Sequence, residues 1–160
     1  MSTRVGLGFD IHPFSDDPAR RLVLGGVSLD GRGLHGHSDA DVVCHAIADA
    51  LLGAVGLGDI GTMFPDTDPA LADADSRQLL AEVVGKISPS WRLLNVDCTV
   101  IAEMPHLAGQ RLEMQHRLQA VLGAPVSVKA KRGEGLGALG RREGIACLAT
   151  ALLEELQEGN

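Results

Sequence analysis

The sequence predicts a single α+β domain that contains both strands and helices. Its 160 residues, of which 45% are hydrophobic, suffice for one core and would be crowded as two domains. Apolar residues recur with a period of two in some segments and at helical intervals in others. No internal repeat, low-complexity tract or linker divides the chain, so we expect one domain over residues 1–160.

Each element has its own signal along the chain. Strands are indicated by alternation and by β-branched residues, and helices by apolar spacing of three and four between capping residues. We expect a strand over residues 4–9, a hairpin over 22–29, a helix from 38 or 39 to 55, a helix from 75 or 76 to 87, a strand over 94–102, a helix over 108–122 and a strand over 125–130. Gly56 and Gly58 are expected to end the first of these helices, and Gly123 is expected to end the helix over 108–122.

Local sequence pattern does not decide the structure of two segments. Residues 58–69 carry turn residues throughout, and a loop of this length usually has a function. Residues 143–156 contain Ala, Leu and Glu, which favour a helix, but alternate apolar residues there could also line one face of a strand.

Composition excludes several classes of partner. Aromatic residues make up 2% of the chain and the formal net charge is −7, so neither base stacking nor a basic surface favours nucleic acid. No signal peptide and no apolar run of membrane-spanning length is present, which predicts a cytoplasmic protein without membrane contact. The three cysteines lie far apart in apolar stretches, as reduced core thiols do.

A carboxylate and two imidazoles form a candidate metal site. Asp10 and His12 are two residues apart, so both project to the same side of an extended segment. His45 is expected in the middle of the next helix, on one face with Asp41 and Asp49, whose carboxylates could orient the histidines. Two imidazoles, one carboxylate and a vacant position suit a catalytic zinc. A structural or capping role is the alternative for the Asp-x-His pair.

Further polar residues surround this cluster in the sequence. His37 precedes the expected helix, whose first N–H groups could face an anion, so His37 could touch phosphate. Asp59, Asp66 and Asp68 in the long loop could bind sugar-like hydroxyls or a harder metal such as magnesium. Turn formation is their alternative role.

A basic, glycine-rich region lies near the C-terminus. Its five cations are Lys129, Lys131, Arg132, Arg141 and Arg142, five of the fourteen Lys and Arg residues in the chain. They could neutralise phosphate, with Glu134 among them as a magnesium ligand, or they could form a solvated loop. The region matches no standard phosphate-binding motif.

Several motifs follow one another in a specific order. They are residues 6–12 (GLGFDIH), 37–41 (HSDAD), 45 with 49–54 (DALLGA), 58–61 (GDIG), 64–69 (FPDTDP), 140–141 (GR) and 143–146 (EGIA). With these motifs the chain resembles, over nearly its whole length, the 2-C-methyl-D-erythritol 2,4-cyclodiphosphate synthases of the non-mevalonate isoprenoid pathway.

The resemblance implies a set of site residues. Asp10, His12 and His45 would hold Zn²⁺ or another divalent transition metal, and Glu134 would hold Mg²⁺ or Mn²⁺ on the diphosphate. The implied catalytic residues are His37, Arg132 and Glu134. The implied substrate contacts are Asp10, His12, His37, Ser38, Asp59, Gly61, Phe64, Asp66, Asp68, Ala102, Pro105, His106, Leu107, Lys131, Arg132, Gly133, Glu134 and Arg141.

The resemblance also implies a fold and a reaction. The family fold is a mixed four-stranded sheet with helices on one side, assembled as a homotrimer around a β-lined central cavity that could hold an isoprenoid diphosphate. It makes residues 143–156 a strand facing the threefold axis. Active sites between subunits would cyclise 4-diphosphocytidyl-2-C-methyl-D-erythritol 2-phosphate, with residues 102–107 and 131–134 enclosing the cytidine part. The 2-phosphate would attack the β-phosphorus and expel CMP.

Some positions differ from the usual pattern of that family. Residues 131–133 replace a threonine-rich stretch, His106 stands where Lys is common, and Ala138 replaces a Phe near the cavity. Two other functions compete with the cyclase: a zinc-dependent phosphohydrolase that admits water at the metal, and a non-catalytic trimer that binds isoprenoid diphosphates. From the length we expect no fused cytidylyltransferase domain.

Overall fold

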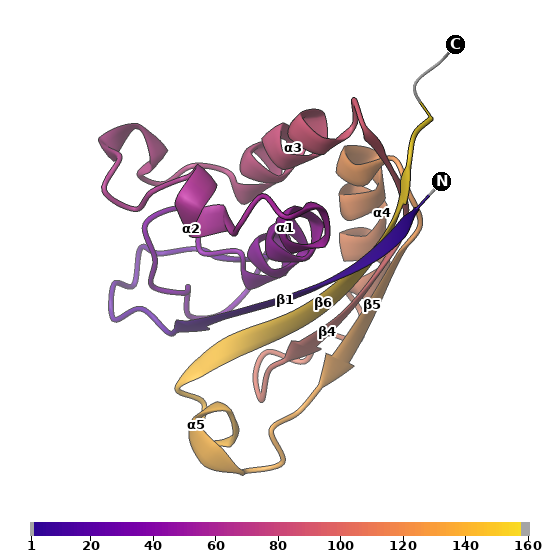
Figure 1. Cartoon of the computed structure of the whole chain (residues 1–160). Coiled ribbons are helices and arrows are strands. Elements are labelled where there is room, and N and C mark those ends of the chain that lie inside the picture. The colour runs from indigo at the N-terminus through magenta and orange to yellow at the C-terminus, as the bar shows by residue number, and fades with distance from the viewer. Residues whose placement is uncertain (1, 158–160) are drawn as a thin grey trace.

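A mixed four-stranded sheet forms one layer of the protein, whose residues 2–157 are described by a computed structural model (Figure 1). The strands are β1 (Thr3–Pro13), β4 (Trp91–Ile101), β5 (Val126–Lys131) and β6 (Gly144–Glu155). Their order is β1-β6-β4-β5. β6 pairs antiparallel with both β1 and β4, whereas β4 and β5 are parallel and are joined through a helix, as parallel neighbours require.

The long helices all cover the same face of this sheet (Figure 1). They are α1 (Val42–Val55), α3 (Ser76–Ile87) and α4 (Arg111–Leu122). A separate hairpin is formed by β2 (Leu22–Leu24) and β3 (Val27–Leu29), and the short elements are α2 (Ile60–Met63), η1 (Pro69–Leu71) and α5 (Gly137–Gly140). The predicted α+β class, with a mixed four-stranded sheet, is therefore confirmed.

Helix α1 packs unusually close to β1 because the strand presents glycine to it. A Cβ atom on Gly6 would overlap the carbonyl oxygen of Ala50, and one on Gly8 would overlap that of Ala46. Residues of the same parity on β1, Asp10 and His12, therefore project toward the helical layer.

The opposite face of the sheet is apolar and exposed. Val5, Leu7 and Phe9, which the alternation placed on one face, are 69%, 67% and 52% exposed. Ile11 and Leu148 are exposed as well. The buried face of β1 is thus the glycine face. The sequence pattern identified the two faces correctly but not which of them meets the core.

Several boundaries differ from the sequence prediction. β1 continues to Pro13 and includes Asp10 and His12. α1 begins at Val42, because Asp41 and neither Ser38 nor Asp39 is its N-cap, and α4 begins at Arg111. Both helices end at the predicted glycines in left-handed conformation.

The C-terminal segment, left open by local pattern, is strand β6. It is one of the two inner strands of the sheet, and its inner face is buried. All three cysteines are buried as predicted. Within residues 2–157, no helix combines the length and the apolarity that crossing a bilayer requires.

Candidate metal centre and substrate pocket

Asp10, His12 and His45 meet at the junction of β1 and α1. One carboxylate oxygen of Asp10 (Oδ2) lies 3.1 Å from His12 Nε2 and 3.0 Å from His45 Nδ1. The three candidate ligand atoms lie within 4.8 Å of one another. Among the described residues, no other group of His, Cys, Asp or Glu is close enough to share an ion.

The elements explain why these three side chains converge. Asp10 and His12 share the inner face of β1, and the two glycines before them allow α1 to lie directly on that face. His45 lies in the first turn of α1 and not in its middle, because the helix starts at Val42. The start of α1 thus places one imidazole against the end of β1.

The second nitrogen of each imidazole also has a partner. His12 Nδ1 is 2.7 Å from the carbonyl oxygen of His35, so this nitrogen carries a hydrogen and Nε2 faces Asp10. His45 Nε2 lies 2.9 Å from Ser76 Oγ and 3.1 Å from Ser38 Oγ. Hydroxyls and carbonyls at these outer positions are how proteins orient metal-binding histidines.

The carboxylate of Asp10 and the two imidazoles attract positive charge to the cluster. Burial opposes ionisation of Asp10, but hydrogen bonds and attraction from His12 and His45 hold the pKa of Asp10 well below its usual range. Burial likewise opposes a charged His12, yet the hydrogen bond and charge of Asp10 raise the pKa of His12. A carboxylate oxygen and two ring nitrogens this close together attract positive charge, which protons on the imidazoles or a bound cation can supply. The donor set of two imidazoles and one carboxylate fits a divalent metal.

An open pocket of about 660 Å³ lies beside the cluster. Its lining includes most of the predicted residues of the metal and phosphate end: Asp10, His12, His37, Ser38, His45, Gly61, Phe64 and Asp66. Ser38 is buried and His37 is half-buried, whereas Gly61 and Asp66 are exposed. The structure therefore brings into one pocket residues that lie up to 56 positions apart, from Asp10 to Asp66.

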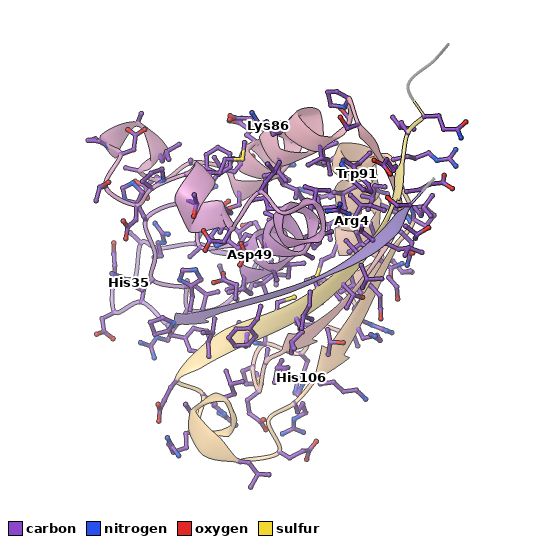
Figure 2. The ribbon with its side chains drawn as sticks, viewed as in Figure 1. Arg4, His35, Asp49, Lys86, Trp91 and His106 are labelled. Atoms are coloured by element: carbon purple, nitrogen blue, oxygen red, sulfur yellow. The ribbon has the colours of Figure 1, made fainter. Side chains whose placement is uncertain are left out.

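Asp59 and Asp68 have capping contacts in the long loop. Asp59 caps α2 and accepts hydrogen bonds from the N–H and hydroxyl of Thr62, which lower its pKa. Asp68 caps η1, and its carbonyl oxygen lies 2.8 Å from His37 Nε2. Asp49 accepts a hydrogen bond from the N–H of Ile60 at 2.7 Å and so ties α1 to α2, between which it lies in Figure 2. Asp59 and Asp68 therefore have the turn-forming role that was the alternative to ligand binding, and Asp49 has a structural contact as well.

Asp41 is not part of the site, so the prediction that its carboxylate orients the histidines is wrong. Its fully buried carboxylate accepts hydrogen bonds from the backbone N–H groups of Gly25, Gly26, Val43 and Cys44. It therefore holds the β2–β3 turn against the start of α1. The expected anion site at this helix start is also wrong, because the Asp41 carboxylate already binds those N–H groups.

The residues predicted to hold the cytidine end do not line this pocket. They are Ala102, Pro105, His106, Leu107, Lys131, Arg132, Gly133, Glu134 and Arg141, and they lie after the last residues of β4 and β5 and around α5. This is the same end of the sheet as Asp10 and His12, but β4 and β5 are two and three strands away from β1. Figure 2 shows His106 well separated from His35, which borders the metal end. Among residues 2–157, Glu134 belongs to no group of three or more acidic, cysteine or histidine side chains that could hold an ion.

The basic region is less cationic than its composition indicates. Lys129 pairs with Asp97, Arg132 with Glu103, and Arg141 with Glu143. Three of its five cations thus have a carboxylate partner. Glu103 is itself buried, and its Oε2 has no hydrogen-bond partner.

Sequence reasoning missed three residues that support the site. Ser76 and Asp39 stand behind His45, and Arg20 binds the loop that carries His35, His37 and Ser38. The sequence pattern predicts Ser76 and Asp39 only as residues at helix starts. No local pattern links Arg20 or Ser76 to residues so distant in the chain, so only the fold reveals these contacts.

A three-ligand cluster that borders an open pocket is the arrangement of catalytic metal centres, which keep one position for substrate. Fold and site together thus define an α+β protein with a candidate catalytic metal centre. A model of the YgbB family matches residues 3–154. The chain belongs to this family, as its motifs predicted.

Known proteins of this family are similar over most of the chain. The chain is 53% identical to a 2-C-methyl-D-erythritol 2,4-cyclodiphosphate synthase of Rubrobacter xylanophilus, with 94% of each protein covered. It is 53% identical to a bifunctional enzyme IspD/IspF of Anaeromyxobacter dehalogenans, covering 92% of this chain but 39% of that enzyme. The fold matches IspF of Plasmodium falciparum in a CDP complex with a TM-score of 0.84 at 34% identity, covering 98% of both chains.

Proposed function

We propose that this protein cyclises 4-diphosphocytidyl-2-C-methyl-D-erythritol 2-phosphate to 2-C-methyl-D-erythritol 2,4-cyclodiphosphate and releases CMP. The convergence of Asp10, His12 and His45 beside an open pocket carries the proposal. The named relatives bear out the predicted enzyme class and pathway. Neither the phosphohydrolase nor the non-catalytic alternative is favoured by them.

The metal and phosphate end would orient the methylerythritol phosphate. Asp10, His12 and His45 would hold Zn²⁺ or a similar ion, which supplies a Lewis acid and a template for the phosphate when bound. Ser38 can donate its hydroxyl to the phosphate from the pocket wall. His37 is held through Nε2 by the carbonyl of Asp68, which directs its other ring nitrogen for contact with the substrate.

The reaction needs positioning more than proton transfer. An oxygen of the 2-phosphate forms a bond to the β-phosphorus, the bond from that phosphorus to the bridging oxygen breaks, and CMP leaves with this oxygen. Both reacting groups are anionic, so neutralisation and in-line alignment are the main tasks of the protein. We assign Arg132 and Glu134 to the diphosphate, Glu134 as a ligand of Mg²⁺ or Mn²⁺ there.

We further propose a homotrimer with active sites between subunits. The exposed face of Val5, Leu7, Phe9 and Ile11 is an apolar patch of the kind that marks a protein interface. The cytidine-binding residues would then come from the neighbouring subunit, because within one chain they lie away from the metal pocket. The sheet would line a central cavity where Arg141 could contact an isoprenoid diphosphate.

The assignment of residues 1–160 to one functional domain and a cytoplasmic location both stay predictions. So does the cytidine pocket of residues 102–107 with Lys131 and Gly133. The Plasmodium falciparum relative binds CDP, which supports a cytidine diphosphate-linked substrate here.

Phosphorus NMR with the cytidine substrate, Zn²⁺ and Mg²⁺ tests the proposal. Cyclic diphosphate and CMP in equal amounts are the expected products. CMP with a linear product would identify a hydrolase, and binding without release of CMP would identify the non-catalytic alternative.

A further inference from the structure

The ring nitrogen of His45 that faces away from Asp10 contacts a buried polar pair. His45 Nε2 lies 2.9 Å from the hydroxyl of Ser76, the first residue of α3, which is 1% exposed. The hydroxyl of Ser76 in turn donates to a carboxylate oxygen of Asp39. Three residues from three segments thus form a chain of contacts behind the candidate metal site.

The carboxylate of Asp39 determines which way the Ser76 hydroxyl points. A carboxylate accepts hydrogen bonds and donates none, so the single hydroxyl hydrogen of Ser76 is directed at Asp39. The backbone N–H of Ser76 also donates to Asp39, at 3.2 Å. Ser76 Oγ therefore offers only lone pairs to His45, and Nε2 must carry the hydrogen in that contact.

We propose that Ser76 and Asp39 are positioning residues that select the His45 tautomer with hydrogen on Nε2 and the lone pair on Nδ1. In this structure Nδ1 faces Asp10 Oδ2 at 3.0 Å as a hydrogen-bond donor, so it is on metal binding that the lone pair replaces this hydrogen and points to where the ion would sit. Partners of this kind fix the tautomer and ring orientation of metal-binding histidines. The inference deepens the proposed function, because it rests on His45 being a metal ligand.

Ser38 differs from Ser76 although both hydroxyls are near the same nitrogen. Ser38 Oγ is 3.1 Å from His45 Nε2, but it contacts no carboxylate and lines the substrate pocket. Its other hydroxyl neighbour, Ser76 Oγ, is 3.4 Å away, so its hydrogen is not committed to a carboxylate and can turn toward a phosphate. The two serines thus have different roles: Ser76 orients the metal ligand His45, and Ser38 faces the substrate pocket.

Zinc affinity measured by competition with a chromophoric chelator tests this division without substrate. Ser76→Ala removes the acceptor at Nε2 and should weaken zinc binding about 10- to 100-fold, the usual effect of losing such a partner. Ser38→Ala, the matched control, should change zinc affinity by less than about threefold. Ser88→Ala, an exposed serine just after α3, should have no effect.

Asp39→Asn tests the same contact from its other end. In the orientation that keeps the Ser76 N–H paired, the new amide donates to Ser76 Oγ and turns the hydroxyl hydrogen toward His45. We therefore expect weaker zinc binding in this variant as well. In ¹⁵N-labelled, zinc-loaded protein, the His45 Nε2 hydrogen should be protected from exchange in the wild type and unprotected in Ser76→Ala.

Wild-type zinc affinity in Ser76→Ala or in Asp39→Asn overturns the proposal. So does an equal loss of affinity in Ser38→Ala, which would make any hydroxyl near Nε2 equivalent. Because affinity is read without turnover, the inference can fail while cyclisation is found. Cyclisation can equally be absent while the inference holds.

Discussion

The two halves of the candidate active site differ in how far one chain completes them. At the metal end, Asp10 and His45 are locked by contacts with each other and with Ser76, and the atoms that would bind an ion converge. At the diphosphate end, Lys131, Arg132 and Glu134 are exposed and form no closed pocket with the metal ligands. The first half is built within one chain, and the second is a surface.

This difference has a physical origin in the sheet. The metal end lies where α1 covers β1, so close packing fixes its geometry. The diphosphate end lies beyond the last residues of β5, in a glycine-rich loop whose cations pair with nearby carboxylates. We infer that the metal end binds its ligand alone, whereas the other end needs a neighbouring subunit.

The largest effect is expected from His45→Ala. This change removes one of three ligand atoms, so bound zinc should fall to background and cyclisation should be lost together with it. Elemental analysis and phosphorus NMR give the two measurements.

His116→Ala is the control for this experiment. His116 is an exposed residue of α4, outside the metal pocket, so its loss should leave zinc and activity unchanged. Zinc retained in His45→Ala would mean that other residues bind the metal.

A second large effect is expected from Gly8→Ala, which disrupts the close packing of α1 on β1 next to the metal ligands. The added methyl would overlap the carbonyl oxygen of Ala46 and force α1 away from β1. We expect a loss of about 3 kcal/mol in the free energy of unfolding. Zinc affinity should fall as well, because His45 would move away from Asp10. Urea unfolding followed by circular dichroism measures the first quantity.

Gly53→Ala provides the matched control, since it adds the same methyl to the helix that Gly8 contacts. No atom lies within 4 Å of its Cβ position, and Gly53 is inside α1. Alanine there should stabilise the protein by up to about 1 kcal/mol through helix propensity. Equal destabilisation by both changes would show that the α1–β1 contact does not support the site.

Much of the fold and of the metal end could be predicted from local sequence. The period of two in β1 put Asp10 and His12 on one face, and apolar spacing revealed the helix of His45. The start of α1 was missed because its capping residue depends on tertiary contacts. Asp41 caps α1 while it binds the hairpin turn at Gly25 and Gly26, and no pattern near residue 41 reports that contact.

The rest of the site depends on contacts between distant residues. Ser76 meets His45 across 31 positions, and Arg20 reaches the loop before α1. Likewise, the ion pair of Arg132 with Glu103 spans 29 positions, so the charge of the basic region could not be judged from composition. Pairings of this kind follow from topology, which short-range periodicity does not encode.

A smaller effect is expected from Arg20→Ala, which loosens the loop at the metal end. The Arg20 guanidinium donates to the carbonyls of Leu34, Gly36 and Ser38 and to Asp73. Without it, Ser38 and His37 should be less well placed for phosphate, and KM for the substrate should rise about tenfold, or about 1.4 kcal/mol. Zinc affinity should change little, because none of the three ligands contacts Arg20.

Arg21→Ala is the matched control, since Arg21 is the exposed neighbour of Arg20 and lies outside the metal pocket. Steady-state kinetics should show the rise in KM for Arg20→Ala alone. A rise of equal size in both variants would mean that general positive charge, and not loop positioning, is what the substrate requires.

The smallest effect is expected from Arg132→Ala, at the open end. The Arg132 side chain is 52% exposed, so its contact with a diphosphate would be partly screened by solvent. We expect KM to rise about fivefold, corresponding to about 1 kcal/mol, and the rise to shrink at high salt. Zinc affinity should stay at the wild-type value, because Arg132 lies outside the metal pocket.

Lys86→Ala, on the exposed side of α3, is the control and should leave KM unchanged. If Arg132→Ala weakened zinc binding, the two ends would be coupled within one chain, and the division between them would have to be abandoned.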